Sequence, residues 1–292
     1  MLETEVRAAM PPPESYLSAT WKRFKRHKLA MFSGVLLLAF YAMAIFAPHI
    51  APFPYQEVNP GNFLQAPSSE HLMGTDRLGR DVFSRIVYGG RISLAVGFLS
   101  SGLAVVIGVL VGSIAGYFGG ILDDILMRFT EVVMAFPVFF LLLTIAALFP
   151  SRNIFTIMVI IGVTSWPGLA RIVRAQMLSL RDQEFTEAAR ALGASDARVI
   201  FRHLVPNCLA PVIVSATLRV GGAILTESGL SFLGLGPVGA PSWGMILNQG
   251  RSYIRLAPWL CLWPGVFIFL TVLAFNYIGD GLRDALDPKL KQ

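Results

Sequence analysis

The chain has 292 residues, of which 54% are hydrophobic and only 14% are charged. A soluble globular domain carries about 25% charged residues, so the composition excludes an ordinary soluble protein and predicts an integral membrane protein. The net charge of +6 could suggest nucleic acid as a partner. However, the basic residues lie between apolar runs rather than along a groove with interleaved aromatic residues, so they indicate membrane topology and no nucleic acid.

The N-terminal region predicts a cytoplasmic tail and a first transmembrane helix. Residues 1–28 are polar and end in a basic stretch, and the uncharged run 29–50 is long enough to cross the hydrocarbon core of a bilayer. A basic flank before an apolar run is also typical of a secretory signal peptide. The long preceding region and the length of the run favour a retained helix.

Residues 51–91 are rich in Pro, Asn, Gly and charges and predict an extracytoplasmic loop before a second span at about 92–117. Within that span Gly108, Gly112 and Gly116 recur every four residues. Small residues at this spacing leave one helix face nearly flat, so that another backbone can approach closely. We expect a helix-packing face there, although glycine is also simply frequent in membrane helices.

Four further apolar runs predict spans at about residues 130–149, 154–170, 208–235 and 258–278. A polar turn is expected at 119–124 and a Gly/Pro-rich loop at 236–257. Pro137 and Pro167 lie inside two of the runs, and a proline in a membrane helix usually marks a kink. The sequence therefore predicts an all-α, polytopic protein with six transmembrane helices and a short charged tail at 284–292.

The basic residues predict the orientation. Six spans place both termini on one side, which carries sixteen Lys and Arg residues against seven on the other side. The positive-inside rule puts both termini, together with the charged segment 171–207, in the cytoplasm. Four arginines between Arg77 and Arg91 argue against this orientation, but Asp76 and Asp81 partly neutralise them.

The segment 171–207 predicts two short helices on the cytoplasmic surface. One face of the first carries four residues at helical spacing, namely Phe185, Ala188, Ala189 and Leu192. Gly193 can adopt the positive φ that ends a helix. A second helix at 197–205 is expected to be capped by Ser195 or Asp196 and stopped by Pro206. Such a small-residue face would allow close docking of a partner, and the alternative is a surface loop lying on the membrane.

The same segment resembles the EAA loop of binding-protein-dependent ABC importer permeases. That loop reads E-A-A, three residues, G, nine residues, I-x-L-P, and the matching positions here are Glu187, Ala188, Ala189, Gly193 and Pro206. His203 and Val205 depart from the pattern mildly. The resemblance implies that residues 187–197, with Ala194 among them, form the coupling helix that docks into a groove of an ATPase subunit.

Three more stretches resemble the C-type subunits of dipeptide and oligopeptide permeases: residues 74–94, 115–120 and 279–288. This resemblance implies a type I ABC importer permease fold, with one extra N-terminal helix and a five-helix core at 92–283. It also implies a B-type permease partner, two ATPase subunits, an extracytoplasmic substrate-binding protein, a peptide substrate and the cytoplasmic membrane of a bacterium or archaeon. Nickel-chelate and glutathione permeases of the same family are the alternatives.

No catalytic, metal or cofactor site is expected in the chain itself. It contains no G-x-x-x-x-G-K-[ST] loop, so the chain is not expected to be an enzyme, and Mg-ATP would be bound by partner subunits. Cys208 and Cys261 form no C-x-x-C pair and fall within or at the edge of apolar runs, where buried thiols are the default.

Two charged residues lie inside the fifth apolar run. Arg219 is at its middle, where an arginine costs about 2.5–3.5 kcal/mol, which argues for a polar cavity or a partner rather than lipid. An ion pair with Glu227, an inter-chain contact and a contact with the substrate carboxylate all remain open. Glu227 and Ser228 lie nearer the outer end and could belong to an external gate.

Rival classes are an ion-coupled carrier and a membrane-embedded hydrolase. The carrier would need several intramembrane carboxylates, and mainly Glu227 is available. The hydrolase would need a catalytic constellation at bilayer depth, but all four histidines lie outside the apolar runs.

Overall fold

The computed structural model describes residues 16–149, 153–237 and 239–286. Within these ranges every regular element is helical, apart from one isolated bridge between Thr75 and Asp81. Four of the basic residues behind the predicted orientation lie outside the described residues: Arg7, Arg152, Lys289 and Lys291.

Four helices are long and apolar enough to cross a membrane: α3 (Lys28–Ile45), α5 (Val82–Phe118), α13 (Leu209–Phe232) and α15 (Trp259–Leu286). Two bent pairs are further candidate spans: α6 (Gly120–Ala135) with α7 (Val138–Leu148), at 84°, and α8 (Ile154–Thr164) with α9 (Pro167–Leu180), at 43°. Pro137 and Pro167 lie at the two breaks, because proline cannot donate the backbone hydrogen bond that continues a helix. If each bent pair is one span, the described chain has the six predicted spans.

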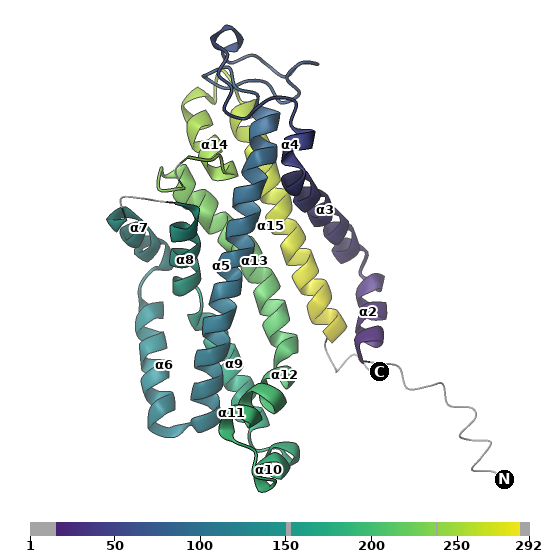
Figure 1. Cartoon of the computed structure of the whole chain (residues 1–292), viewed down its shortest axis with the longest axis vertical. Helices are drawn as coiled ribbons and strands as arrows, with labels where there is room; N and C mark the ends of the chain where they lie inside the picture. The colour runs from purple at the N-terminus through teal and green to yellow at the C-terminus, as the bar shows by residue number, and fades with distance from the viewer. Residues whose placement is uncertain (1–15, 150–152, 238, 287–292) are drawn as a thin grey trace, which may run out of the picture.

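The long helix α5 runs through the middle of the bundle, with α6, α7 and α8 on one side and α13, α15 and α3 on the other (Figure 1). Helix α9 packs along α5. The largest buried cluster joins α3, α5, α13 and α15 around the fully buried Trp243. Its ring nitrogen donates to the Ile86 carbonyl at 3.0 Å. This indole therefore fixes the position of α14 (Trp243–Gly250) against the bundle.

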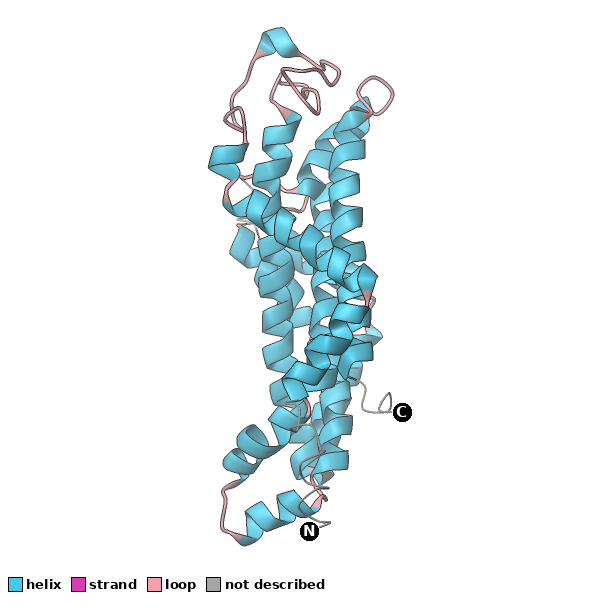
Figure 2. Cartoon of the chain, turned by 90° about the vertical axis from the view of Figure 1, so that its right-hand side faces the viewer, coloured by secondary structure: helices cyan, strands magenta, loops and turns pink. Residues whose placement is uncertain are grey.

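The two ends of the elongated molecule differ (Figures 1 and 2). The "loop end" holds residues 51–81, α14 and three short helices: α4 (Ala47–Ile50), η1 (Pro60–Asn62) and η3 (Arg251–Tyr253). The "α10 end" holds α10 (Glu184–Ala191), α11 (Asp196–Arg198), η2 (Val199–Leu204) and α12 (Val205–Asn207). The N-terminal helix α2 (Tyr16–Arg26) packs against the last part of α15.

Several predicted boundaries are wrong, because hydropathy finds only the apolar part of a helix. α5 begins at Val82 rather than at residue 92. The Asp81 side chain caps this start, because its carboxylate accepts a hydrogen bond from the Ser84 amide at 2.7 Å. The last ten residues of the predicted loop 51–91 are therefore helical. The predicted turn at 119–124 is mostly the first turn of α6, and α15 continues eight residues beyond 278.

Two other local expectations fail. The predicted loop 236–257 contains the helix α14, whose Ser242 side chain caps it by accepting from the Met245 amide at 3.2 Å. Pro206 does not stop the second surface helix, because it occupies the first turn of α12, where no amide donor is needed. The helical path runs from Asp196 to Asn207 through the π-helical η2.

Candidate functional site

The α10 end presents a short helix on a fixed support. α10 ends in a Schellman motif, in which the Gly193 amide donates to the Arg190 carbonyl at 2.9 Å and the Ala194 amide to the Ala189 carbonyl at 3.1 Å. Gly193 has the predicted positive φ, at 78°. The Thr186 hydroxyl, fully buried, donates to the Leu180 carbonyl at 2.9 Å and joins α10 to the end of α9.

A second set of contacts holds this segment against α5. The Tyr117 hydroxyl donates to the Asp196 carboxylate at 2.6 Å, and the Arg190 guanidinium lies over the Tyr117 ring at 5.0 Å. Val199, Ile200 and Leu204 are buried in the same cluster. The helices after Gly193 are therefore packed into the bundle rather than lying loosely on a membrane surface. Tyr117 was not anticipated from the sequence, where it lies at the end of an apolar run.

The predicted apolar face of α10 is divided between the bundle and the surface. Ala189 is buried against the bundle, while Phe185, Ala188 and Leu192 are exposed. Leu192 has 88% of its surface exposed, the largest fraction among the large exposed hydrophobic residues described. Glu187 is also exposed. The free side of α10 is therefore apolar at its C-terminal end and acidic at its start.

The glycines of α5 bring this helix close to α9. A Cβ placed on Gly108 would lie 3.0 Å from the Leu169 Cβ, and one on Gly116 would lie 2.7 Å from the Arg174 carbonyl oxygen. At Gly112 it would overlap the Ala170 carbonyl oxygen and approach the Val173 Cβ to 2.8 Å. Because α9 leads directly to α10, this contact joins the exposed helix to the centre of the bundle.

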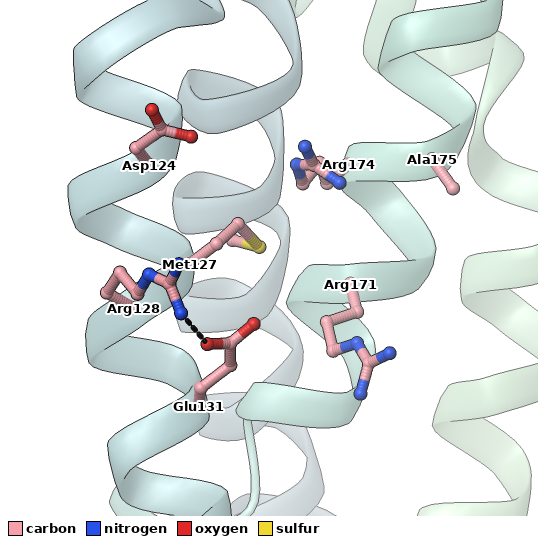
Figure 3. A pocket seen from close by; sticks show the side chains of 7 residues that line it. All are labelled: Asp124, Met127, Arg128, Glu131, Arg171, Arg174 and Ala175. Carbon is pink, nitrogen blue, oxygen red and sulfur yellow. Dashed lines mark hydrogen bonds and ion pairs between the residues drawn. The ribbon is translucent and has the colours of Figure 1, made fainter.

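A charged cleft of about 400 Å³ lies between α6 and α9 (Figure 3). Next to it Asp123 and Arg174 form a two-pronged ion pair, with both nitrogen–oxygen distances at 2.5 Å. Arg128 and Glu131 pair at 3.2 Å on the exposed side of α6. The Asp123–Arg174 pair ties α6 to α9. It is not predictable from local spacing, because the two residues are 51 positions apart.

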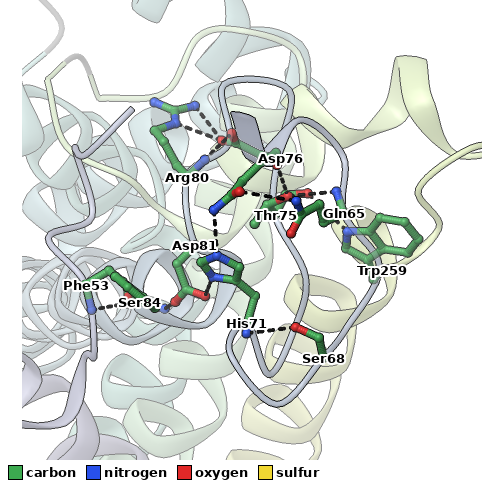
Figure 4. A network of polar contacts seen from close by, with 11 residues as sticks. Phe53, Gln65, Ser68, His71, Thr75, Asp76, Arg80, Asp81, Ser84 and Trp259 are labelled. Carbon is green, nitrogen blue, oxygen red and sulfur yellow. Dashed lines mark hydrogen bonds and ion pairs between the residues drawn. The ribbon is translucent and has the colours of Figure 1, made fainter. Parts of the chain in front are cut away.

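The loop end is held by a network of buried charges (Figure 4). The Asp76 carboxylate pairs with Arg80, at 2.8 Å, and with Arg85, and the His71 ring contacts Asp81 at 3.0 Å. The Trp259 ring nitrogen donates to the Thr75 carbonyl at 3.2 Å and connects the loop to α15. Of the two carboxylates expected to neutralise the arginines between Arg77 and Arg91, Asp76 pairs with Arg80 and Arg85, whereas Asp81 contacts His71.

Burial acts to raise the pKa of Asp76, but the charge of Arg85, the hydrogen bond from Arg80 and the Leu78 amide act against it. The result is that the pKa of Asp76 lies below its ordinary value of 3.8. The carboxylate is therefore charged at neutral pH and neutralises part of the loop's positive charge.

Arg219 and Glu227 do not form the ion pair considered from the sequence. Arg219 donates to the Ser165 carbonyl, in the break between α8 and α9. The fully buried Glu227 accepts from Ser231 at 2.6 Å and Ser93 at 3.3 Å, and it lies beside Ser228 at 3.5 Å. Glu227 thus joins α13 to α5, while Arg219 faces a different neighbour.

Among the described residues, no group of three or more His, Cys, Asp or Glu side chains is arranged to hold a metal ion. The exposed surface of α10 and the cleft between α6 and α9 are instead the main surface features of the α10 end of the molecule. The fold defines a polytopic, α-helical integral membrane protein with a short exposed helix, α10, at one end.

Residues 108–292 match the family described as "Binding-protein-dependent transport system inner membrane component". Residues 15–67 match "N-terminal TM domain of oligopeptide transport permease C". The chain belongs to the binding-protein-dependent ABC importer permeases. It is an all-α permease subunit of the cytoplasmic membrane.

Curated relatives cover nearly the whole chain. It is 46% identical to the dipeptide transport system permease protein DppC of Alkalihalophilus pseudofirmus, over 96% of this chain and 94% of the relative. It is 45% identical to the oligopeptide transport system permease protein OppC of Haemophilus influenzae, over 92% and 87%. The glutathione transport system permease protein GsiD of Pectobacterium atrosepticum is 42% identical, over 93% and 90%.

A solved structure supports the fold. An inward-facing structure of the MetNI methionine ABC transporter aligns with a TM-score of 0.57 and 21% identity, and covers 70% of this chain and 98% of that one. At this identity the likeness concerns the architecture alone, which is that of a type I importer permease.

Proposed function

We propose that the chain is the C-type permease subunit of an ATP-driven importer for dipeptides or oligopeptides. The observation that carries the coupling role is α10: an exposed apolar tip at Leu192 on a helix that is fixed to α9 and α5 through Thr186 and Tyr117. A rigid support is needed if movement of a bound ATPase is to reach the membrane helices. The names of the relatives at 42–46% identity support the peptide substrate.

In the proposed assembly the α10 end faces the cytoplasm and each of two ATPase subunits contacts one permease chain. A B-type permease forms the other half of the pore, and a substrate-binding protein delivers peptide at the loop end. ATP-driven closure of the ATPase pair moves α10, the glycine contact passes the motion from α9 to α5, and the pore opens outward. Mg-ATP is held by the ATPases, so this chain performs no covalent chemistry.

Glutathione is the second candidate substrate, favoured by relatives of that name at 42% identity. Glutathione is itself a short peptide, so both candidates predict the same coupling. Uptake of labelled dipeptides, longer peptides and glutathione by the reconstituted transporter separates them.

The docking role predicts that Leu192→Glu releases the ATPase subunits. Because this side chain is 88% exposed, a charge there leaves the fold intact but places an unpaired charge in the contact. We expect at least a tenfold loss of ATPase subunits in co-purification, since a lost contact of about 1.4 kcal/mol already changes affinity tenfold. Leu72→Glu, at an exposed site on the loop end, is the matched control and should retain them. Equal retention by both variants would rule out α10 as the docking helix.

Gly193→Val should uncouple the transporter. A β-branched residue at a φ of 78° is strained by about 1–2 kcal/mol, which alters the end of α10 although open space surrounds the position. We expect the ATPase stimulation by peptide-loaded binding protein to fall about tenfold. Gly234→Val is the control, because Gly234 closes α13 in the same motif at a φ of 82° and also faces open space, but at the other end. If both variants lose stimulation equally, the effect is general strain and not coupling.

A further inference from the structure

A cavity of about 190 Å³ lies near the middle of the bundle, between α5, α8 and α13. Its polar lining comes from the middle of α5 and α13 and from the break after α8, and includes Ser100, Ser101, Ser165, Arg219 and Thr226. Its volume exceeds the roughly 10–15 Å³ that one water needs. The cavity is therefore large enough to admit a polar group of a ligand about midway along α5 and α13.

Arg219 brings a positive charge to this cavity without a matching negative charge. Among the described residues, its hydrogen-bond acceptor is the Ser165 carbonyl, and Arg219 forms no ion pair with a carboxylate. Glu227, the nearest carboxylate along α13, is occupied by serine hydroxyls. A guanidinium offers five donors, so Arg219 retains donors that one carbonyl does not use.

Ser101 supplies a second free donor. It is only 4% exposed, and its hydroxyl has no hydrogen-bond partner within the part of the chain that the structure describes. The neighbouring hydroxyls differ, because Ser100 donates to the Met158 carbonyl at 3.0 Å and Thr226 to the Gly222 carbonyl at 2.8 Å. A buried hydroxyl without a hydrogen-bond partner costs free energy. A cavity lined by such a hydroxyl and by an arginine is therefore suited to a ligand group that accepts hydrogen bonds.

We propose that this cavity binds the carboxylate of the transported peptide during its passage. The inference rests on the proposed function and adds a substrate contact to it. The guanidinium of Arg219 and the hydroxyl of Ser101 donate to the carboxylate oxygens, and both groups come from helices that the coupling movement displaces. Gly222 lines the cavity on α13 and has no side chain, and the space at its Cβ position is open, so the ligand can enter past it.

The first experiment compares a peptide with a free C-terminus and the same peptide with a C-terminal amide. Uptake by the complete reconstituted transporter is measured with the binding protein equally loaded with either peptide. We expect Arg219→Gln to reduce the ratio of free to amidated uptake by about tenfold or more, since a charge-assisted hydrogen bond contributes enough for such a factor. Arg219→Lys should retain part of the ratio because it keeps the charge.

A loss of uptake that is equal for both peptides would overturn the proposal and make Arg219 a structural or inter-chain contact. If the wild-type complex transports neither peptide with ATP, the proposed function fails, and not merely the site. The ratio separates these cases because any folding defect lowers both uptakes together.

A second measurement does not depend on the binding protein. In the complex with Cys208→Ser and Cys261→Ser, and with the cysteines of the partner chains also replaced, Thr226→Cys places a single thiol at the cavity without removing either proposed donor. Excess free-carboxylate peptide should slow the labelling of this thiol by an anionic methanethiosulfonate at least threefold, and amidated peptide should not. Equal protection by the two peptides, or none by either, would contradict a carboxylate site. Gly222→Leu should give the same protection without peptide, while Gly265→Leu, also into open space but on α15, should not.

Discussion

Asp76→Asn is expected to destabilise the loop end by about 3–5 kcal/mol, because it leaves the buried guanidinium of Arg85 without its counter-charge. Arg85 is 2% exposed and Asp76 is 3% exposed, so water cannot replace the lost partner. The expected result is a thermal unfolding midpoint lower by on the order of 10 °C, with faster proteolysis within residues 51–81.

The matched control is Glu131→Gln, which breaks an ion pair whose side chains are 83% and 61% exposed. Solvent screens such a pair, so no measurable change in the midpoint is expected. If Asp76→Asn behaved like this control, the buried network would not hold the loop.

The same network predicts a dependence on pH. Because the pKa of Asp76 is lower in the folded chain than its ordinary value of 3.8, the charged form stabilises the fold. This contribution is fully present above pH 3.8 and is lost as pH falls through the lower, folded pKa. The wild-type midpoint should therefore fall more steeply below that pH than the Asp76→Asn midpoint.

Gly112→Ala is expected to destabilise the bundle by about 1–3 kcal/mol, the usual effect of overpacking. The added methyl group would overlap the Ala170 carbonyl oxygen and approach the Arg174 backbone nitrogen to 3.0 Å. Backbone atoms cannot turn aside as a flexible side chain can, so α5 and α9 must separate. We expect a lower thermal midpoint, measured on the purified permease pair, and weaker ATPase stimulation.

Gly102→Ala on the same helix is the control, because its Cβ would have no neighbour within 4 Å. Alanine is favoured over glycine in a helix by roughly 0.5–1 kcal/mol, so this variant should be as stable as the wild type or slightly more stable. A midpoint that falls equally in both variants would mean that the glycine spacing serves no packing role.

Residues 108, 112 and 116 illustrate what periodicity can establish. Their spacing predicts a flat face, because position along a helix fixes the direction of each residue. The spacing does not predict which helix packs against this face, since that depends on the path of the chain between residues 117 and 167. Only the structure places α9 there. The packing role itself remains a prediction that Gly112→Ala tests.

The sequence by itself determined the membrane class, the kinks at Pro137 and Pro167, the helix-ending turn at Gly193 and the family, because these depend on local composition, backbone chemistry and motif spacing. The start of α5 at Val82 and the helix α14 lie in polar stretches, where a hydropathy pattern does not reveal helices. The tertiary structure alone decided which charges meet: Asp76 with Arg85, Asp123 with Arg174, and Arg219 with a backbone carbonyl instead of Glu227. Such pairing depends on the rotation and packing of whole helices, which neither composition nor local spacing specifies.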